Sequence, residues 1–190
     1  MYLVSSNIIK AVNFATIKHT KQLRRDKITP YIAHPLAVAL VAESKFNANQ
    51  SCVISAILHD TVEDTNTSIE EIKSLFGEKI AKIVYELTDD SSIQRDKRKE
   101  YSINKIKTYS KEAAIVKYCD ILCNMQELEI QIKQNISIIY KFNWTIKQKV
   151  EYEQKRLMQF STYHKSIKTL ELKKCLNSIK NYLTELNKYN

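Results

Sequence analysis

Apolar residues recur at intervals of three and four positions along most of this chain, which is the period of an amphipathic helix. No clear stretch shows the alternation of apolar and polar residues that is typical of a strand. The helices that the pattern predicts span residues 4–22, 36–46, 51–64, 69–76, 78–88, 113–130, 144–170 and 172–186. We therefore expect an all-α protein, in the form of one compact helical bundle.

Few residues interrupt this pattern. The chain holds one Gly and two Pro, the residue types that are least favourable inside a helix, by about 1 and 3 kcal/mol. Pro30 and Pro35 bracket a constrained turn before the second helix, and the polar stretch 89–100 indicates an exposed connection. A length of 190 residues suits a single domain over 1–190, with a core at about 4–130 and C-terminal helices at 144–187 packed on it.

Short signals locate helix ends and core positions. Ser68 and Glu71 form a capping-box pattern, and Gly77 fits the end of a helix. The helix that follows carries an apolar stripe made of Ile80, Ile83, Val84 and Leu87. The core candidates of the C-terminal helices are Val150, Leu157, Met158 and Phe160.

The net charge of +9 leaves three classes of partner open, namely nucleic acid, a membrane face or a small polyanion. The lysines are scattered among acidic residues, which also fits an ordinary solvated surface. Tyr residues are dispersed and form no stacking platform, so a nucleic-acid-binding module is disfavoured. The oligomeric state stays open.

Cysteine usage and hydropathy indicate a cytoplasmic protein. The four cysteines form no CxxC pair, and small core residues in a reducing compartment are the simpler interpretation, although Cys119 and Cys123 have helical i,i+4 spacing. The N-terminus lacks the pattern of a secretory signal, and no apolar run approaches the ~18 residues of a membrane span.

The stretch AILHDTVEDT concentrates ionisable residues directly after an apolar run. His59, Asp60, Glu63 and Asp64 fall within six positions, and on a helix the i,i+4 offsets bring their side chains to one surface. Three carboxylates together need a compensating cation. Mixed imidazole and carboxylate ligands suit Mn, Fe, Zn or Co better than Mg or Ca.

Two further residues could complete such a metal site. His34 and Asp120 lie in apolar surroundings, where an unpartnered polar group is expensive to bury. Taken alone, His34 also fits a hydrogen-bonded core histidine, and Asp120 fits the acid of a buried salt bridge. The combination of all these elements favours a metal site over these separate structural explanations.

The segments TPYIAHP, AILHDTVEDT, FGEKIAKIVYELTDD and KYCDILCNM resemble, in this order, the hydrolase domain of the RelA/SpoT alarmone family. This family is a branch of the HD-domain metal phosphohydrolases, and its stand-alone small alarmone hydrolases look most similar. The resemblance covers roughly residues 12–130. It implies an enzyme of the stringent response that removes the 3′-diphosphate of guanosine tetra- or pentaphosphate (ppGpp or pppGpp), giving GDP or GTP.

The resemblance also implies the roles of individual residues. One Mn²⁺ per chain would be held by His34, His59, Asp60 and Asp120. Glu63 and Asp64 would handle the water nucleophile and its proton. The nucleotide would be bound by Arg24, Arg25 and Asn124.

The chain departs from the family pattern at three positions. Ile121 replaces a basic residue after the metal-binding aspartate, Gln126 replaces an arginine, and Ile28 replaces a glycine before TPY. These changes leave the implied metal and water groups intact and concern the substrate contacts.

Other functions remain open at this point. Some metazoan small alarmone hydrolases are associated with removal of the 2′-phosphate of NADPH, and other HD phosphohydrolases act on nucleotide mono- or triphosphates. A non-enzymatic module with a structural metal is disfavoured, because a structural metal has no need of the Glu63–Asp64 pair.

Overall fold

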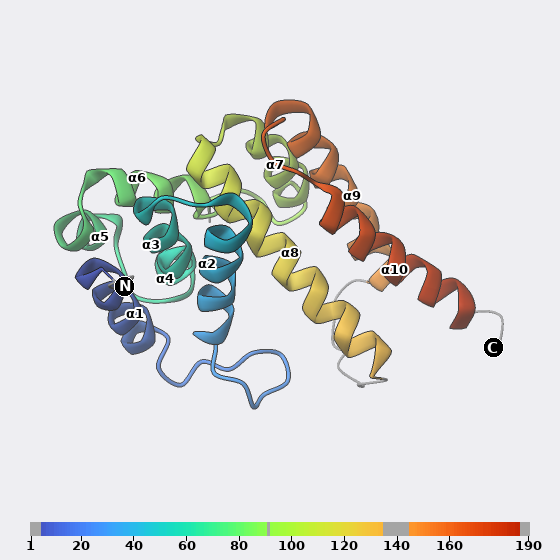
Figure 1. Cartoon of the computed structure of the whole chain (residues 1–190), viewed down its shortest axis with the longest axis horizontal. Coiled ribbons are helices and arrows are strands. Elements are labelled where there is room, and N and C mark those ends of the chain that lie inside the picture. The colour runs from blue at the N-terminus through green and yellow to red at the C-terminus, as the bar shows by residue number, and fades with distance from the viewer. Residues whose placement is uncertain (1–4, 91, 135–144, 187–190) are drawn as a thin grey trace. The chain divides into compact units, whose positions relative to one another are not determined.

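A computed structural model describes residues 5–90, 92–134 and 145–186 of the chain (Figure 1). Within these residues the ordered elements are helical, and the only strand-like feature is an isolated bridge between Leu23 and Pro30. The prediction of an all-α protein is therefore confirmed. The α-helices are α1 Ser6–Lys18, α2 Ala33–Phe46, α3 Gln50–Leu58, α4 Thr61–Asp64, α5 Ile69–Phe76, α6 Glu78–Leu87, α7 Arg98–Lys105, α8 Lys111–Lys133, α9 Ile146–Tyr163 and α10 Leu170–Leu186, and the 3₁₀ turn η1 is Ile106–Thr108.

The helices group into two compact units. The first combines Met1–Ile93 with Tyr109–Asp120, and the second combines Gln94–Thr108 with Ile121–Asn190. In the first unit α3 packs against α1, α2 and α6, and α5 packs against α6 (Figure 1). In the second unit α9 packs against α7, η1 and α10. The expected single domain, with helices 144–187 packed on a core at 4–130, stays a prediction.

Side-chain and backbone caps explain several helix ends. The Ser68 hydroxyl accepts the Glu71 N–H at 3.1 Å and starts α5, while the Glu71 carboxylate pairs with Lys18 at 2.9 Å. The Ser68 half of the predicted capping box is therefore present, whereas the Glu71 side chain pairs with Lys18 of α1. Gly77 ends α5 with φ of 90°, which confirms its predicted position.

The apolar pattern located most of the core. The four stripe residues of α6 are all buried, as are Val150 and Phe160. Leu157 is half-buried, and Met158 is 68% exposed, so the assignment of Met158 to the core is wrong.

Several element boundaries differ from the sequence-based expectation. The first helix ends at Lys18 instead of residue 22, and the helix expected over 144–170 ends at Tyr163. The helix expected over 51–64 ends at Leu58 and resumes at Thr61 as the short α4, because the backbone bends at Asp60, where φ is −98° and ψ is −5°. The polar stretch 89–100 already contains the start of α7, which its lack of apolar residues concealed. The start of the first helix at Val4 lies outside the described residues.

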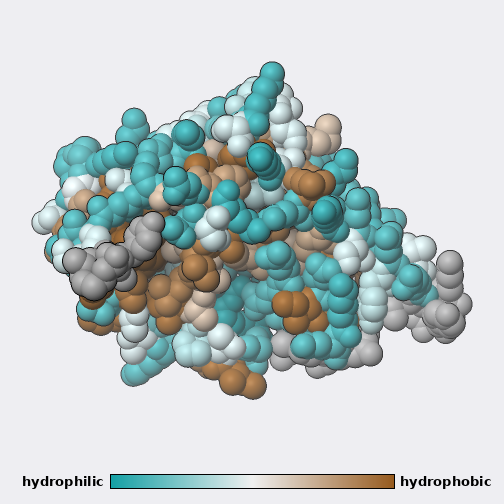
Figure 2. Space-filling model, viewed as in Figure 1, coloured by the Kyte–Doolittle hydropathy of each residue, from teal (hydrophilic) through white to brown (hydrophobic). Residues whose placement is uncertain are grey.

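The surface is mixed in character. Figure 2 shows hydrophilic residues over much of the visible face, with apolar groups between them. The exposed apolar side chains include Ile28 and Leu40. No described helix combines the length and the hydrophobicity that a membrane crossing requires.

Candidate metal and catalytic site

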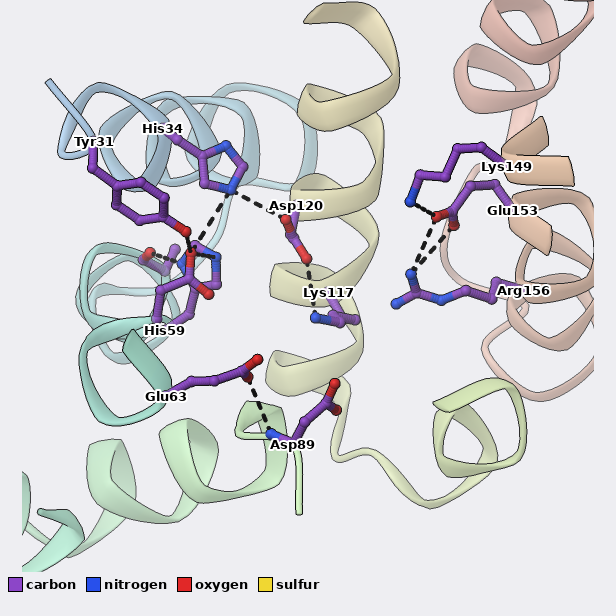
Figure 3. Close-up of polar contacts among 12 residues, drawn as sticks. Tyr31, His34, His59, Glu63, Asp89, Lys117, Asp120, Lys149, Glu153 and Arg156 are labelled. Atoms are coloured by element: carbon purple, nitrogen blue, oxygen red, sulfur yellow. Dashed lines mark hydrogen bonds and ion pairs between the residues drawn. The ribbon is translucent and has the colours of Figure 1, made fainter. Parts of the chain in front are cut away.

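Three buried donor groups from separate segments of the first unit meet at one point (Figure 3). His34 lies in the first turn of α2, His59 directly follows α3, and Asp120 lies in the middle of α8. One ligand atom from each of them lies within 4.8 Å of those of the other two. His34 Nε2 is 3.2 Å from Asp120 Oδ1. A single metal ion could therefore be reached by all three.

The surroundings of His59 suit a metal ligand. Its Nδ1 lies 2.8 Å from the Ala56 carbonyl oxygen, and donation there leaves Nε2 with a free electron pair. Nε2 is buried, makes no hydrogen bond within the described part of the chain, and lies 3.0 Å from Asp60 Oδ2. Two electron-pair donors at this distance need a proton or a metal cation between them. The donor set present therefore fits a divalent metal.

Asp60 brings the fourth predicted ligand to the same place. Its Oδ2 atom faces both histidines, at 3.0 Å from His59 Nε2 and 4.0 Å from His34 Nε2. The same oxygen accepts a hydrogen bond from the Tyr31 hydroxyl at 2.7 Å. The structure thus brings together all four residues that the family resemblance implies as ligands, and their role as ligands stays a prediction.

Positively charged neighbours compensate the buried carboxylates of the cluster. Burial acts to lower the pKa of His59, but the Asp60 carboxylate outweighs it and raises that pKa to about 9. Burial alone would raise the pKa of Asp120, yet Lys117 at 3.0 Å and the hydrogen bond with His34 hold it well below its usual range. The pKa of Asp60 is likewise lowered, chiefly by His59 against the opposing effect of burial. The carboxylates of the cluster are therefore ionised, which is the form in which a carboxylate binds a metal.

Glu63 and Asp64 lie beside this cluster at the α4 turn. The Asp64 N–H donates to the Asp60 carbonyl at 2.9 Å, and Glu63 Oε2 accepts the Asp89 N–H at 3.2 Å. Both residues are partly open to solvent, but the protein around the carboxylates displaces water and raises the pKa of each. A carboxylate with a raised pKa and access to solvent is suited to accept a proton from water.

The predicted nucleotide-binding arginines lie on the loop between α1 and α2. This loop folds back on itself, since the Arg24 N–H donates to the Thr29 carbonyl at 2.8 Å and the Asp26 side chain accepts the N–H groups of Ile28 and Thr29 at 2.9 Å. Positive φ occurs in this loop at Lys21, with 70°, and at Lys27, with 63°, and Ile28 is not among the described residues with positive φ. The replacement of the family glycine by Ile28 is therefore accommodated without backbone strain.

Arg24 and Arg25 differ in their surroundings. Arg24 is half-buried, and its guanidinium carbon lies 5.6 Å from the centre of the Tyr31 ring, whereas Arg25 is exposed. Arg24 is thus held beside the metal cluster through Tyr31.

The third predicted nucleotide contact is on α8. Asn124 is half-buried one turn beyond Asp120, within the second unit. Its neighbour Ile121 is fully packed in the core, and Gln126 is exposed. The role of Asn124 stays a prediction.

Sequence reasoning missed two residues that contact the cluster. Tyr31 donates to Asp60, and Lys117 pairs with Asp120 at the i,i+3 position of α8. A signal existed for Lys117, because i,i+3 spacing on a helix brings opposite charges together. No spacing rule links Tyr31 to Asp60, which lies 29 positions away.

Comparison with known proteins places this site in a family. A family model described as HD domain matches residues 11–141. The guanosine-3′,5′-bis(diphosphate) 3′-pyrophosphohydrolase MESH1 of Xenopus tropicalis is 42% identical over 124 residues, which are 64% of this chain and 69% of that protein. Its namesake in Homo sapiens is 36% identical over 126 residues, which are 65% of this chain and 70% of that protein.

A solved structure extends the comparison to the fold. A metazoan ortholog of SpoT, which hydrolyses ppGpp and plays a role in starvation responses, matches 97% of this chain and 98% of its own with a TM-score of 0.77 at 25% identity. The family match of residues 11–141 spans every donor group of the cluster. The chain therefore belongs to the HD-domain family, and its relatives within that family include guanosine-3′,5′-bis(diphosphate) 3′-pyrophosphohydrolases.

Proposed function

We propose that this protein hydrolyses guanosine 3′,5′-bis(diphosphate), ppGpp, to GDP and diphosphate, and pppGpp to GTP and diphosphate. The observation that carries the proposal is the convergence of His34, His59 and Asp120 beside a pair of solvent-accessible carboxylates. The named activity of the MESH1 relatives supports the choice of substrate.

We further propose that His34, His59, Asp60 and Asp120 hold one Mn²⁺. Nitrogen and carboxylate donors in one set favour a transition metal over Mg²⁺ or Ca²⁺. When bound, such an ion supplies Lewis-acid polarisation of a phosphoryl oxygen and orients a water molecule.

The residues that transfer the proton lie on the α4 turn. Glu63 accepts the proton of the attacking water, and its carboxylate is oriented for this by the Asp89 N–H at 3.2 Å. Asp64, the next residue, shares the task. The water oxygen forms a bond to the phosphorus on the ribose 3′ oxygen, the bond from phosphorus to that oxygen breaks, and the proton is returned to it as the 3′ hydroxyl leaves.

Side chains bind the nucleotide, because the chain has no glycine-rich phosphate loop. Arg24 lies over the ring of Tyr31, which contacts the cluster, and Arg25 follows it in the same loop. A planar guanidinium can both stack on a base and hold a phosphate in a fork. Asn124 is assigned the remaining contact, on the resemblance alone.

The test is product analysis of the purified protein with ppGpp and Mn²⁺. We expect GDP and diphosphate in equal amounts by ion-exchange chromatography, and no reaction after chelation of the metal. The same assay with NADPH and with nucleoside mono- and triphosphates measures substrate choice. Release of orthophosphate from NADPH without cleavage of ppGpp would replace the proposed substrate, and no turnover of any phosphorylated nucleotide would refute an enzymatic role.

A further inference from the structure

The loop between α1 and α2 carries three residues that contact one another and the catalytic turn, and we refer to His19, Gln22 and Tyr31 as the Tyr31 frame. The His19 ring lies 4.9 Å from the Tyr31 ring, measured between centroids. His19 Nδ1 lies 2.7 Å from Gln22 Oε1. His19 is 3% exposed, so the Tyr31 ring packs against a buried side chain.

The hydroxyl of Tyr31 is hydrogen-bonded to one oxygen of Asp60, and the Asp64 carboxylate also interacts with it. The hydroxyl donates to Asp60 Oδ2 at 2.7 Å, and this is the oxygen that faces both His59 and His34. An ionised carboxylate has no hydrogen to donate, so the Tyr31 hydroxyl is the donor of this bond. A carboxylate held in this way has a fixed orientation toward the point where the donors converge.

A second member of the Tyr31 frame, Gln22, contacts the C-terminal end of α4. Gln22 Nε2 donates to the Asp64 main-chain carbonyl at 2.7 Å. Asp60 precedes α4 and Asp64 ends it, so the frame contacts both ends of the helical turn that carries Glu63. A shift of this turn would require these contacts to break.

Arg24 lies over the face of the Tyr31 ring, with its guanidinium carbon 5.6 Å from the ring centroid. Main-chain hydrogen bonds within the loop fix the backbone of each of these two residues. The Tyr31 N–H donates to the Gln22 carbonyl at 2.9 Å, and the Arg24 N–H donates to the Thr29 carbonyl at 2.8 Å. One aromatic side chain therefore contacts a predicted metal ligand through its hydroxyl and a predicted nucleotide ligand through its face.

We propose that Tyr31 is a positioning residue with two separable functions: its hydroxyl orients Asp60 for metal binding, and its ring orients Arg24 for nucleotide binding. This inference rests on the proposed function, since it assumes that Asp60 holds the metal and Arg24 the nucleotide. Hydrogen-bond partners of metal ligands typically contribute 10- to 100-fold to metal affinity or activity.

The two functions can be measured separately with two variants. Tyr31→Phe removes the hydroxyl and keeps the ring, so we expect the Kd for Mn²⁺, measured by titration calorimetry on metal-free protein, to rise about 10-fold or more. At saturating Mn²⁺ its KM for ppGpp should stay within about twofold of wild type. Tyr31→Leu removes the ring as well, and its KM at saturating Mn²⁺ should rise about 10-fold.

A matched control is Tyr109→Phe. Tyr109 is a buried tyrosine of the same unit and lies outside the site, so its variant should keep the Mn²⁺ affinity and the KM of wild type. A general effect of losing a tyrosine hydroxyl would change both variants alike, whereas positioning by Tyr31 changes only one.

The outcomes distinguish this inference from the proposed function. Wild-type protein that cleaves ppGpp, together with a Tyr31→Phe variant of unchanged Mn²⁺ affinity, overturns the role of Tyr31 and leaves the function standing. A rise in KM for Tyr31→Phe equal to that for Tyr31→Leu overturns the division between hydroxyl and ring. Wild-type protein that neither binds Mn²⁺ nor cleaves ppGpp overturns both. Should Tyr31→Leu fail to fold, Tyr31→Phe still decides the role of the hydroxyl.

Discussion

Glu63 differs from the four predicted metal ligands in its contacts. Its carboxylate is held by the Asp89 N–H and faces solvent, whereas the ligand carboxylates face the histidines. We therefore expect Glu63→Gln to fold, to keep Mn²⁺ and to bind ppGpp, while its turnover falls by roughly 10²-fold or more, the scale of a lost general base. Metal content by elemental analysis and diphosphate release, measured on the same sample, check this expectation.

Asp64→Asn provides the comparison for this experiment. The side chain of Asp64 is proposed to share the proton transfer, so we expect a smaller loss of turnover with the metal retained. Loss of the metal in Glu63→Gln would identify Glu63 as a ligand and contradict the division of roles. Full activity with the metal bound would mean that another group accepts the proton.

Arg24 is expected to act on binding rather than on chemistry. Its guanidinium is stacked on Tyr31 and has no assigned part in proton transfer. Arg24→Ala should raise the KM for ppGpp by about 10-fold, the loss of roughly one charge-assisted hydrogen bond to phosphate, and change kcat little. Steady-state kinetics at saturating Mn²⁺ separate the two parameters. A fall in kcat with unchanged KM and metal content would show that the assignment is wrong.

At the scale of single residues, the sequence predicted the candidate metal ligands and missed the residues that hydrogen-bond to them. His34, His59, Asp60 and Asp120 were recognisable because histidines and acids in apolar surroundings need a partner. Tyr31 was not recognisable, because a tyrosine beside a proline has many structural explanations. Its function depends on a hydroxyl position that only the folded loop defines.

Among the elements, the helices with a clear apolar stripe were predictable and the others were not. The stripe of α6 is buried as the period requires. The start of α7 was missed because its sequence, RKEYSINK, offers few apolar residues to show a period. The break between α3 and α4 was missed for a different reason, since both segments continue the same apolar pattern and only the backbone angles at Asp60 separate them.

Gly77 offers a test at the scale of elements, because it joins α5 to α6 at φ of 90° and ψ of 165°, a region almost restricted to glycine. An added Cβ would meet no atom within 4 Å, so any effect of Gly77→Ala comes from backbone strain alone. We expect the free energy of unfolding to fall by about 1–3 kcal/mol in urea titrations. Lys82→Ala, at an exposed site of α6, is the control and should change it little. An unchanged midpoint for Gly77→Ala would show that the junction can adopt another conformation.

At the scale of the whole molecule, the site depends on segments that are distant in the sequence. The first unit is discontinuous, because Tyr109–Asp120 returns to it after the excursion 94–108. Asp120 therefore meets His34 across 86 positions. Local periodicity cannot predict such a meeting, and the resemblance to a known family supplied it. The net charge of +9 did not help to locate the site, whose nearest residues are chiefly histidines and carboxylates.

This long-range meeting makes metal binding a property of the folded chain, so Mn²⁺ should stabilise it. A ligand bound only by the native state at 100 times its Kd adds about 2.7 kcal/mol to the free energy of unfolding, which for a chain of this size raises Tm by about 5–10 °C. Asp120→Asn removes a predicted ligand charge at nearly constant volume and should lose most of this shift in thermal melts with and without Mn²⁺. His164→Gln is the control, because His164 lies in the second unit, where its Nε2 is 2.7 Å from the Ile106 carbonyl oxygen, and its variant should keep the wild-type shift. Equal shifts in wild type and Asp120→Asn would show that Mn²⁺ binds elsewhere, whereas loss of the shift in Asp120→Asn alone would connect stability to the cluster that joins α2, the α3–α4 junction and α8.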